Sequence, residues 1–333
     1  MTDTTDSTLA YTALQPDDIL ETLEDLDFDC NGRFLALNSY ENRVYKIGTN
    51  ESDNIVVKFY RPERWTDAEI EEEHAFAIEL AEKEIPVVPP LAIDGTTLFH
   101  NGPFRLAVYD CRGGRAPDLD NLDQLKQLGR FVARIHLVGE TSDFEHRPEI
   151  DVESYGIASR DFLLDEGFIP DEMCDVYEGI ADMIIDGVEA AGDRAGNFHE
   201  LRLHADFHPG NVLIDREVFH IVDLDDARTG PAVQDLWMFL SGERAEQTPQ
   251  LNALLKGYEE FRRFDARELH LIEALRSLRI MHYAAWLARR WEDPAFKQAF
   301  PWFNSRRYWD EHILALREQL ALMQEPPLEW RGD

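Results

Sequence analysis

The sequence predicts an α+β protein built as two lobes, an antiparallel sheet followed by a mostly helical part. The first 110 residues alternate short runs rich in Val, Ile, Tyr and Phe with polar turns, whereas apolar positions beyond residue 117 recur at helical spacing. With 333 residues, 44% of them apolar, the chain can bury a large core in two domains or in one domain of two lobes. We therefore expect a first lobe over residues 1–110, a connector over 111–117 and a helical second lobe over 118–333.

The first lobe begins with a helix and an antiparallel meander. Pro16 stands early in a helix predicted to reach Leu26, because Ile19, Leu20 and Leu23 would share one face. Three strands are then predicted by their β-branched and aromatic residues, at 33–37, 43–47 and 54–60.

One helix interrupts this sheet after the third strand. Thr66 and Glu69 form a capping box ahead of a helix expected to end near Lys83. An Asp-Gly pair at 94–95 then separates two short runs, which predicts a hairpin of 90–93 with 97–99. A last strand over 104–109 completes a predicted sheet of five strands with one inserted helix.

The second lobe is predicted to be mostly helical. Five helices follow from apolar residues at a spacing of about 3.6, over 122–135, 173–191, 251–261, 266–291 and 308–323. A short β patch at 212–214 and 220–222 interrupts them.

The composition excludes several classes of partner. The chain carries 66 acidic and 33 basic residues, a net charge of −33, whereas nucleic-acid binding depends on clustered Lys and Arg. No apolar run approaches the roughly 18 residues that a membrane helix needs. Three distant cysteines form no disulfide framework. We expect a cytoplasmic monomer with reduced thiols, no nucleic acid and no membrane partner, its acidity reflecting either adaptation to salt or an ordinary acidic surface.

The densest cluster of chemically capable residues lies at 203–211, Leu-His-Ala-Asp-Phe-His-Pro-Gly-Asn, with Asp223 twelve residues further on. The first carboxylate, Asp206, can accept or orient a hydroxyl proton. Asn211 and Asp223 offer oxygen atoms to Mg²⁺, a hard ion that binds few protein ligands together with phosphates. The pattern therefore favours phosphoryl transfer over its structural alternative, a loop whose Asx residues only bind their own backbone.

These residues resemble the catalytic loop and metal-binding aspartate of the aminoglycoside-phosphotransferase-like branch of the protein-kinase fold. Longer strings, at 37–45, 57–65, 222–228 and 230–237, resemble bacterial serine/threonine kinases of that branch. The likeness runs from about Leu14 to Leu328 and implies a bilobal protein-kinase-like fold with an antiparallel-sheet N-lobe and a mostly helical C-lobe. One departure is Ala205, which stands where the branch usually has Gly.

The resemblance assigns roles residue by residue. Asp206 matches the catalytic base, while Asn211 and Asp223 match the magnesium ligands, so that Asp223 is both a catalytic and a metal residue. Lys58, one of only six lysines, matches the lysine that pairs with the α- and β-phosphates of ATP. Its predicted partner is Glu73; Glu71 and Glu72 are competitors, since only one of the three can face Lys58 from a helix.

Four further residues receive weaker assignments. Ser39 lies in a polar turn at the place of a Gly-rich phosphate loop, which is alternatively an ordinary hairpin turn. Tyr109 is expected near the adenine. Asp235 resembles a buried aspartate that accepts N–H groups of the catalytic loop. His204 is expected to orient that loop rather than bind metal, and the aromatic residues near the C-terminus are expected to form core.

The function implied is an ATP- and Mg²⁺-dependent Ser/Thr protein kinase that also phosphorylates itself and acts in bacterial stress responses. A small-molecule kinase that phosphorylates a metabolite hydroxyl is the alternative, because only eleven residues separate Asp223 from Asp235 and leave no long peptide-docking segment. A non-catalytic nucleotide-binding scaffold is a third possibility, against which the intact Asp206, Asn211, Asp223 and Lys58 argue.

Overall fold

The computed structural model describes residues 11, 14–51, 54–330 and 332, and it divides into two compact units. Unit 1 comprises the chain up to Ala116 together with 145–147 and 210–225; unit 2 comprises 117–144, 148–209 and 226–333. The segment 210–225, which the predicted boundaries place in the helical lobe, thus belongs to unit 1. Backbone hydrogen bonds explain this, because Ile214 pairs with Arg115 and Ile221 accepts from Val88.

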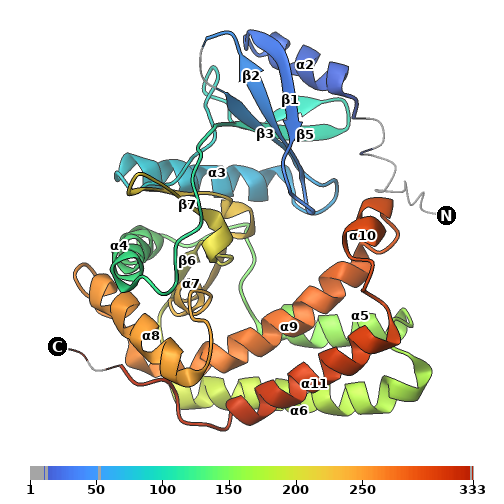
Figure 1. Ribbon diagram of the computed structural model, residues 1–333, viewed down its shortest axis with the longest axis vertical. Helices are drawn as coiled ribbons and strands as arrows, with labels where there is room; N and C mark the ends of the chain where they lie inside the picture. The colour runs from blue at the N-terminus through green and yellow to red at the C-terminus, as the bar shows by residue number, and fades with distance from the viewer. Residues whose placement is uncertain (1–10, 12–13, 52–53, 331, 333) are drawn as a thin grey trace. The chain divides into compact units, whose positions relative to one another are not determined.

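Unit 1 contains an antiparallel sheet of five strands in the order β1-β2-β3-β5-β4, as Figure 1 shows. Its strands are β1 (Cys30–Ala36), β2 (Arg43–Thr49), β3 (Ile55–Phe59), β4 (Phe99–Asn101) and β5 (Phe104–Asp110). The five-stranded sheet is therefore confirmed, but the predicted hairpin of 90–93 with 97–99 is wrong. Only a bridge of Ile93 with Thr96 forms there, because Pro89 and Pro90 have no N–H to donate to a ladder.

Two helices flank this sheet, and alternation along the strands decides which side chains meet each of them. Helix α2 (Pro16–Asp25) packs on Val57 and Phe59 of β3, while α3 (Asp67–Glu82) contributes Ile70 to a cluster with Ala107 of β5. Lys58 lies between Val57 and Phe59 and opposite Ala107, so it projects toward the face that α3 covers. The Thr66–Glu69 capping box of α3 is present as predicted.

A short hairpin completes unit 1. Strands β7 (Val212–Asp215) and β8 (Val218–Ile221) pair with Val212 opposite Ile221. This pairing brings the residues before β7 and after β8 together at the open end of the hairpin.

Unit 2 is mostly helical, and its larger core lies among α5, α6, α9, α10 and α11. Figure 1 shows α6, α9 and α11 running beside one another. The helices are α4 (Leu122–Gly139), α5 (Ala158–Asp165), α6 (Cys174–Ala195), α7 (Gln234–Trp237), α8 (Arg244–Tyr258), α9 (Ile272–Arg289), α10 (Pro294–Ala299) and α11 (Arg306–Leu322). Strands β6 (Glu200–Leu203) and β9 (Arg228–Pro231) form a two-stranded sheet.

Several boundaries in unit 2 differ from the predicted ones. Helix α8 begins at Arg244 instead of 251, because a capping box of Glu243 and Glu246 starts it and Pro249 is accommodated inside it. The predicted helix 266–291 begins with a 3₁₀ segment, Ala266–Leu271. Of the aromatic residues near the C-terminus, Phe296, Phe303 and Trp309 are core, as expected. The helices among the described residues include none long and apolar enough to cross a membrane.

Candidate active site

Lys58 is the centre of a charged cluster in unit 1. Its Nζ lies 2.9 Å from Oδ1 of Asp223 and 3.8 Å from Oδ1 of Asp225. Burial disfavours the charged form of Lys58, but these carboxylates outweigh burial and raise its pKa well above the ordinary value. Lys58 is therefore a fixed cation on the α3 side of the sheet, next to a predicted metal ligand.

The three glutamates of α3 have separate environments. Glu73 is buried, and burial raises its pKa to about 7 although the charge of Lys58 opposes the shift. Glu72 turns instead to the backbone of 145–147, where three N–H groups donate to its carboxylate. Glu71 is exposed. Glu73 is thus the one that interacts with Lys58, although within the described chain the salt bridges of Lys58 go to Asp223 and Asp225.

Asn211 and Asp223 are brought together by the β7–β8 hairpin. The backbone carbonyl of Asn211 accepts the N–H of Val222 at 3.0 Å, and the Asn211 side chain is buried. Asp223 has a φ of +63° and a side chain that is 51% exposed. An amide oxygen and a carboxylate oxygen at this place fit a hard divalent cation, which often binds one or two carboxylates plus phosphates. The described residues hold no group of three or more His, Cys, Asp or Glu side chains suited to a metal ion.

Asp225 is a functional candidate that the motif analysis missed. Its buried carboxylate accepts from Nδ2 of Asn42 at 3.1 Å and pairs with Arg64, and its backbone carbonyl accepts from Arg147 at 2.6 Å. Asn42 in turn accepts the N–H of Arg61 at 3.0 Å. This network fastens the turn between β1 and β2 to the segment that carries Asp223. The available signal was the position of Asp225, two residues after the predicted metal ligand.

The two remaining predicted nucleotide residues lie in the same unit. Ser39 is half-buried in the turn between β1 and β2, which Arg61 holds by donating to the carbonyls of Tyr40 and Glu41. The ring of Tyr109 lies 5.4 Å from Nζ of Lys58, and its hydroxyl is 3.0 Å from that of Tyr60. The side chain of Tyr109 therefore packs beside the lysine. Ser39 and Tyr109 as nucleotide contacts stay predictions.

Asp206 has its own set of partners in unit 2. Nη1 of Arg279, on α9, lies 2.6 Å from its Oδ1, and Nε2 of His208 lies 3.5 Å from its Oδ2. Burial alone would raise the pKa of Asp206, but the contacts with His208 and Arg279 lower it to about 2. Asp206 is consequently a carboxylate at any physiological pH, able to accept a hydrogen bond from a hydroxyl. The motif gave no sign of Arg279, which is 73 residues away in the sequence.

The loop that carries Asp206 is held from below by Asp235, as predicted. The Asp235 carboxylate accepts the N–H groups of His204 at 2.9 Å and Ala205 at 2.8 Å, and His136 lies 3.3 Å away. Ala205 has a φ of +67°, a left-handed conformation in which glycine is unstrained. The methyl group is accommodated, so the departure from the family's usual glycine leaves the loop formed.

A pocket of about 580 Å³ begins at Arg279. Its lining is mainly aromatic and basic and includes Trp237, Arg276, Arg279, Tyr283, Trp302 and Tyr308. The aromatic residues were expected to be core; Trp302 instead lines this pocket and is 46% exposed.

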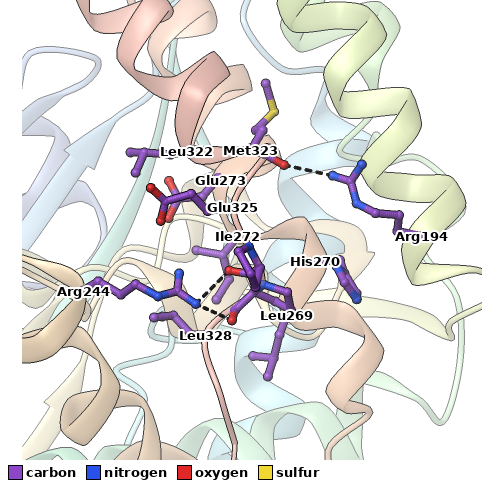
Figure 2. Close-up of a pocket in the computed structure, with 12 residues that line it drawn as sticks. Arg194, Arg244, Leu269, His270, Ile272, Glu273, Leu322, Met323, Glu325 and Leu328 are labelled. Atoms are coloured by element: carbon purple, nitrogen blue, oxygen red, sulfur yellow. Dashed lines mark hydrogen bonds between the residues drawn. The ribbon is translucent and has the colours of Figure 1, made fainter.

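Figure 2 shows another pocket of unit 2, of only about 20 Å³, next to the C-terminal segment. Arg244 donates there to the carbonyls of Pro326 and Pro327, and Arg194 donates to that of Met323. These bonds hold the end of the chain against the helices, which is a structural role.

Comparison with known proteins identifies the family. The model of the phosphotransferase enzyme family matches residues 33–272. The chain belongs to this family. Stress response kinase A of Escherichia coli K12 is 44% identical over 323 residues, 97% of this chain and 98% of the relative. The serine/threonine protein kinase RdoA of Salmonella typhimurium is 41% identical over 324 residues, with the same shares covered.

Solved structures of phosphotransferases share the fold. An amicoumacin kinase, in complex with AMP-PNP, Ca²⁺ and its antibiotic, superposes with a TM-score of 0.74 at 18% identity, covering 96% of both chains. An aminopropanol kinase gives a TM-score of 0.67 at 18% identity, over 92% of this chain and 96% of that one. The predicted kinase-like α+β fold is confirmed, and the protein is a phosphotransferase.

Proposed function

We propose that this phosphotransferase is an ATP- and Mg²⁺-dependent Ser/Thr protein kinase, acting on itself and on other proteins in a bacterial stress response. The observation that carries the proposal is full-length similarity, above 40% identity, to relatives named as stress response and serine/threonine protein kinases. The clustering of Lys58, Asn211 and Asp223 in one unit supports its nucleotide chemistry.

The residues divide the work of phosphoryl transfer. Lys58 can neutralise phosphate oxygens, and Asn211 with Asp223 would hold the divalent cation, which when bound offsets charge on the phosphates. Asp206, kept ionised by Arg279 and His208, accepts the hydrogen bond of the acceptor hydroxyl and directs it. Asp235 fixes the backbone of the loop from which Asp206 projects.

The proposal includes the setting in which the enzyme works. We infer a monomer in the cytoplasm whose substrates are Ser and Thr hydroxyls of proteins, with neither nucleic acid nor membrane as partner. The net charge of −33 supports the exclusion of nucleic acid, and the three cysteines are free, which agrees with a reducing compartment.

A small-molecule kinase is the second candidate, and the folds of the amicoumacin and aminopropanol kinases favour it. Incubation with γ-labelled ATP and Mg²⁺, with and without a cell lysate, separates the two. Label on Ser or Thr of protein, lost in Asp206→Asn, is the expected result. Label confined to small metabolites would overturn the protein-kinase assignment and support the second candidate.

A further inference from the structure

The pocket beside Asp206 has the size and chemistry of a ligand site. At about 580 Å³ it falls within the 300–1,000 Å³ typical of small-ligand pockets. Two of its aromatic side chains are unusually open to solvent, since Tyr283 is 41% and Trp302 46% exposed. Exposed large aromatic groups that share one concave surface usually mark a place where something binds.

The charged groups of this pocket are already paired within unit 2. Arg279 pairs with Asp206, Arg276 with Glu273 at 3.4 Å, and Glu311 with Arg307 at 2.7 Å. The guanidinium of Arg276 also lies 5.4 Å from the ring centre of Trp237. A cationic ligand would therefore meet two arginines in the lining and a carboxylate that already has a partner, whereas the aromatic walls favour an apolar group.

Arg279 connects this pocket with the reacting end of the acceptor. The same side chain that holds Asp206 at 2.6 Å forms part of the pocket lining. An acceptor hydroxyl directed by Asp206 is thus close to the pocket, and the next residues of an extended peptide follow at about 3.3 Å each.

We propose that this pocket binds an aromatic or large aliphatic side chain located beside the acceptor Ser or Thr of a protein substrate. The inference rests on the proposed protein-kinase function and gives it a substrate preference. Trp302 and Tyr283 form the walls, and Arg279 is the boundary between side-chain recognition and phosphoryl transfer.

A set of synthetic peptides with a single Ser tests this preference. Each peptide carries Phe, Leu, Ser, Glu or Lys at one flanking position, and labelling by γ-labelled ATP with Mg²⁺ gives kcat/KM. At one flanking position Phe or Leu should raise kcat/KM about tenfold over Ser, the scale of one well-filled apolar subsite. Trp302→Ala and Tyr283→Ala should each bring the Phe-to-Ser ratio close to one, through KM more than kcat. Leu314→Ala, 54% exposed on α11 and outside the pocket, is the matched control and should keep the ratio.

The outcomes separate this inference from the function on which it rests. Labelled peptides without preference for an apolar neighbour, or a preference unchanged in both variants, would overturn the pocket assignment alone. A preference for Lys that both variants abolish would also overturn it, in favour of a cationic occupant. Absence of label on every peptide and on the protein itself would overturn the protein-kinase function and the pocket assignment together.

Discussion

Glu73 in unit 1 and Asp206 in unit 2 are both carboxylates removed from water, yet their pKa values shift in opposite directions. Burial raises the pKa of Glu73 to about 7, whereas the pKa of Asp206 falls to about 2. The difference is the availability of a cation. Arg279 lies against Asp206 at 2.6 Å, but Lys58, the cation near Glu73, is bound to Asp223 at 2.9 Å. A buried acid is therefore ionised by a dedicated partner and not by a nearby charge that another acid has claimed.

The surroundings of these two acids differ in the same way. Around Lys58, position is set by ion pairs shared among several carboxylates, with Asp225 linking Asn42 and Arg64. Around Asp206, position is set by neutral backbone groups that donate to Asp235. The first arrangement can exchange partners when a phosphate arrives, and the second gives a fixed support for the group that directs the hydroxyl.

The largest effects should come from removing one acid of each region. Asp206→Ala and Asp223→Ala should each lower kcat by about 10³-fold or more, as loss of a positioned acid or base does. ATP affinity should change only a few-fold in Asp206→Ala and weaken strongly in Asp223→Ala, which loses the predicted metal ligand. Phosphotransfer assays with nucleotide titrations measure both quantities. Full activity in either variant would contradict the assignment of that residue.

Loss of Asp235 should give the next largest effect, on stability. Asp235→Ala leaves two buried N–H groups without an acceptor, at a cost of about 3 kcal/mol in the free energy of unfolding. Asp235→Asn should cost less, since its amide oxygen can still accept one of them. Asp310→Ala, an exposed acid on α11, is the control and should change the melting temperature little. A melting temperature equally unaffected in Asp235→Ala would show that the loop needs no such support.

Removing the dedicated cation of Asp206 should change the pH dependence of activity. The lowered pKa of Asp206 keeps it ionised, and adds to stability, above its ordinary pKa of about 4, and this contribution is lost as the pH falls through about 2. Without Arg279 the burial of Asp206, with Asp226 nearby, raises its pKa, so Arg279→Gln should lose about tenfold in kcat/KM near pH 5 relative to neutral pH. Arg279→Lys should retain most of the profile. Identical pH profiles for all three proteins would mean that His208 alone keeps Asp206 ionised.

What could be predicted from sequence depended on whether partners are close along the chain. The five-stranded sheet, the capping box of α3 and the contacts of Asp235 followed from local patterns and from a motif of known geometry. Arg279 and the Asn42–Asp225 contact could not be predicted, because each joins residues 73 or more positions apart that no single pattern contains. The strand assigned to 90–93 failed for a different reason, since its apolar residues suited a strand while its prolines could not supply the ladder's donors.

A smaller effect should measure how far Lys58 serves Glu73. If the two charges act on each other, Lys58→Met and Glu73→Gln should be non-additive, with a coupling energy of about 1 kcal/mol in kcat/KM. Glu72→Gln paired with Lys58→Met is the control, because Glu72 is engaged with the backbone of 145–147. Additive losses for Glu73 together with coupling for Glu72 would make Glu72 the functional partner of the lysine.

The smallest effect concerns the backbone on which the neutral support of Asp206 depends. Ala205 has a φ of +67°, a conformation that costs an L-residue about 1 kcal/mol relative to glycine. Glycine also has more conformational freedom to lose on folding, so Ala205→Gly should change the melting temperature by no more than about 2 °C. Ala205→Val should lower it by several times as much, since a β-branched side chain suits this conformation poorly. The Asp235 contacts should hold the loop in Ala205→Gly, leaving kcat nearly unchanged. A large loss of kcat in Ala205→Gly, without loss of stability, would show instead that the methyl group itself helps to fix Asp206, and that hydrogen bonds to Asp235 do not suffice.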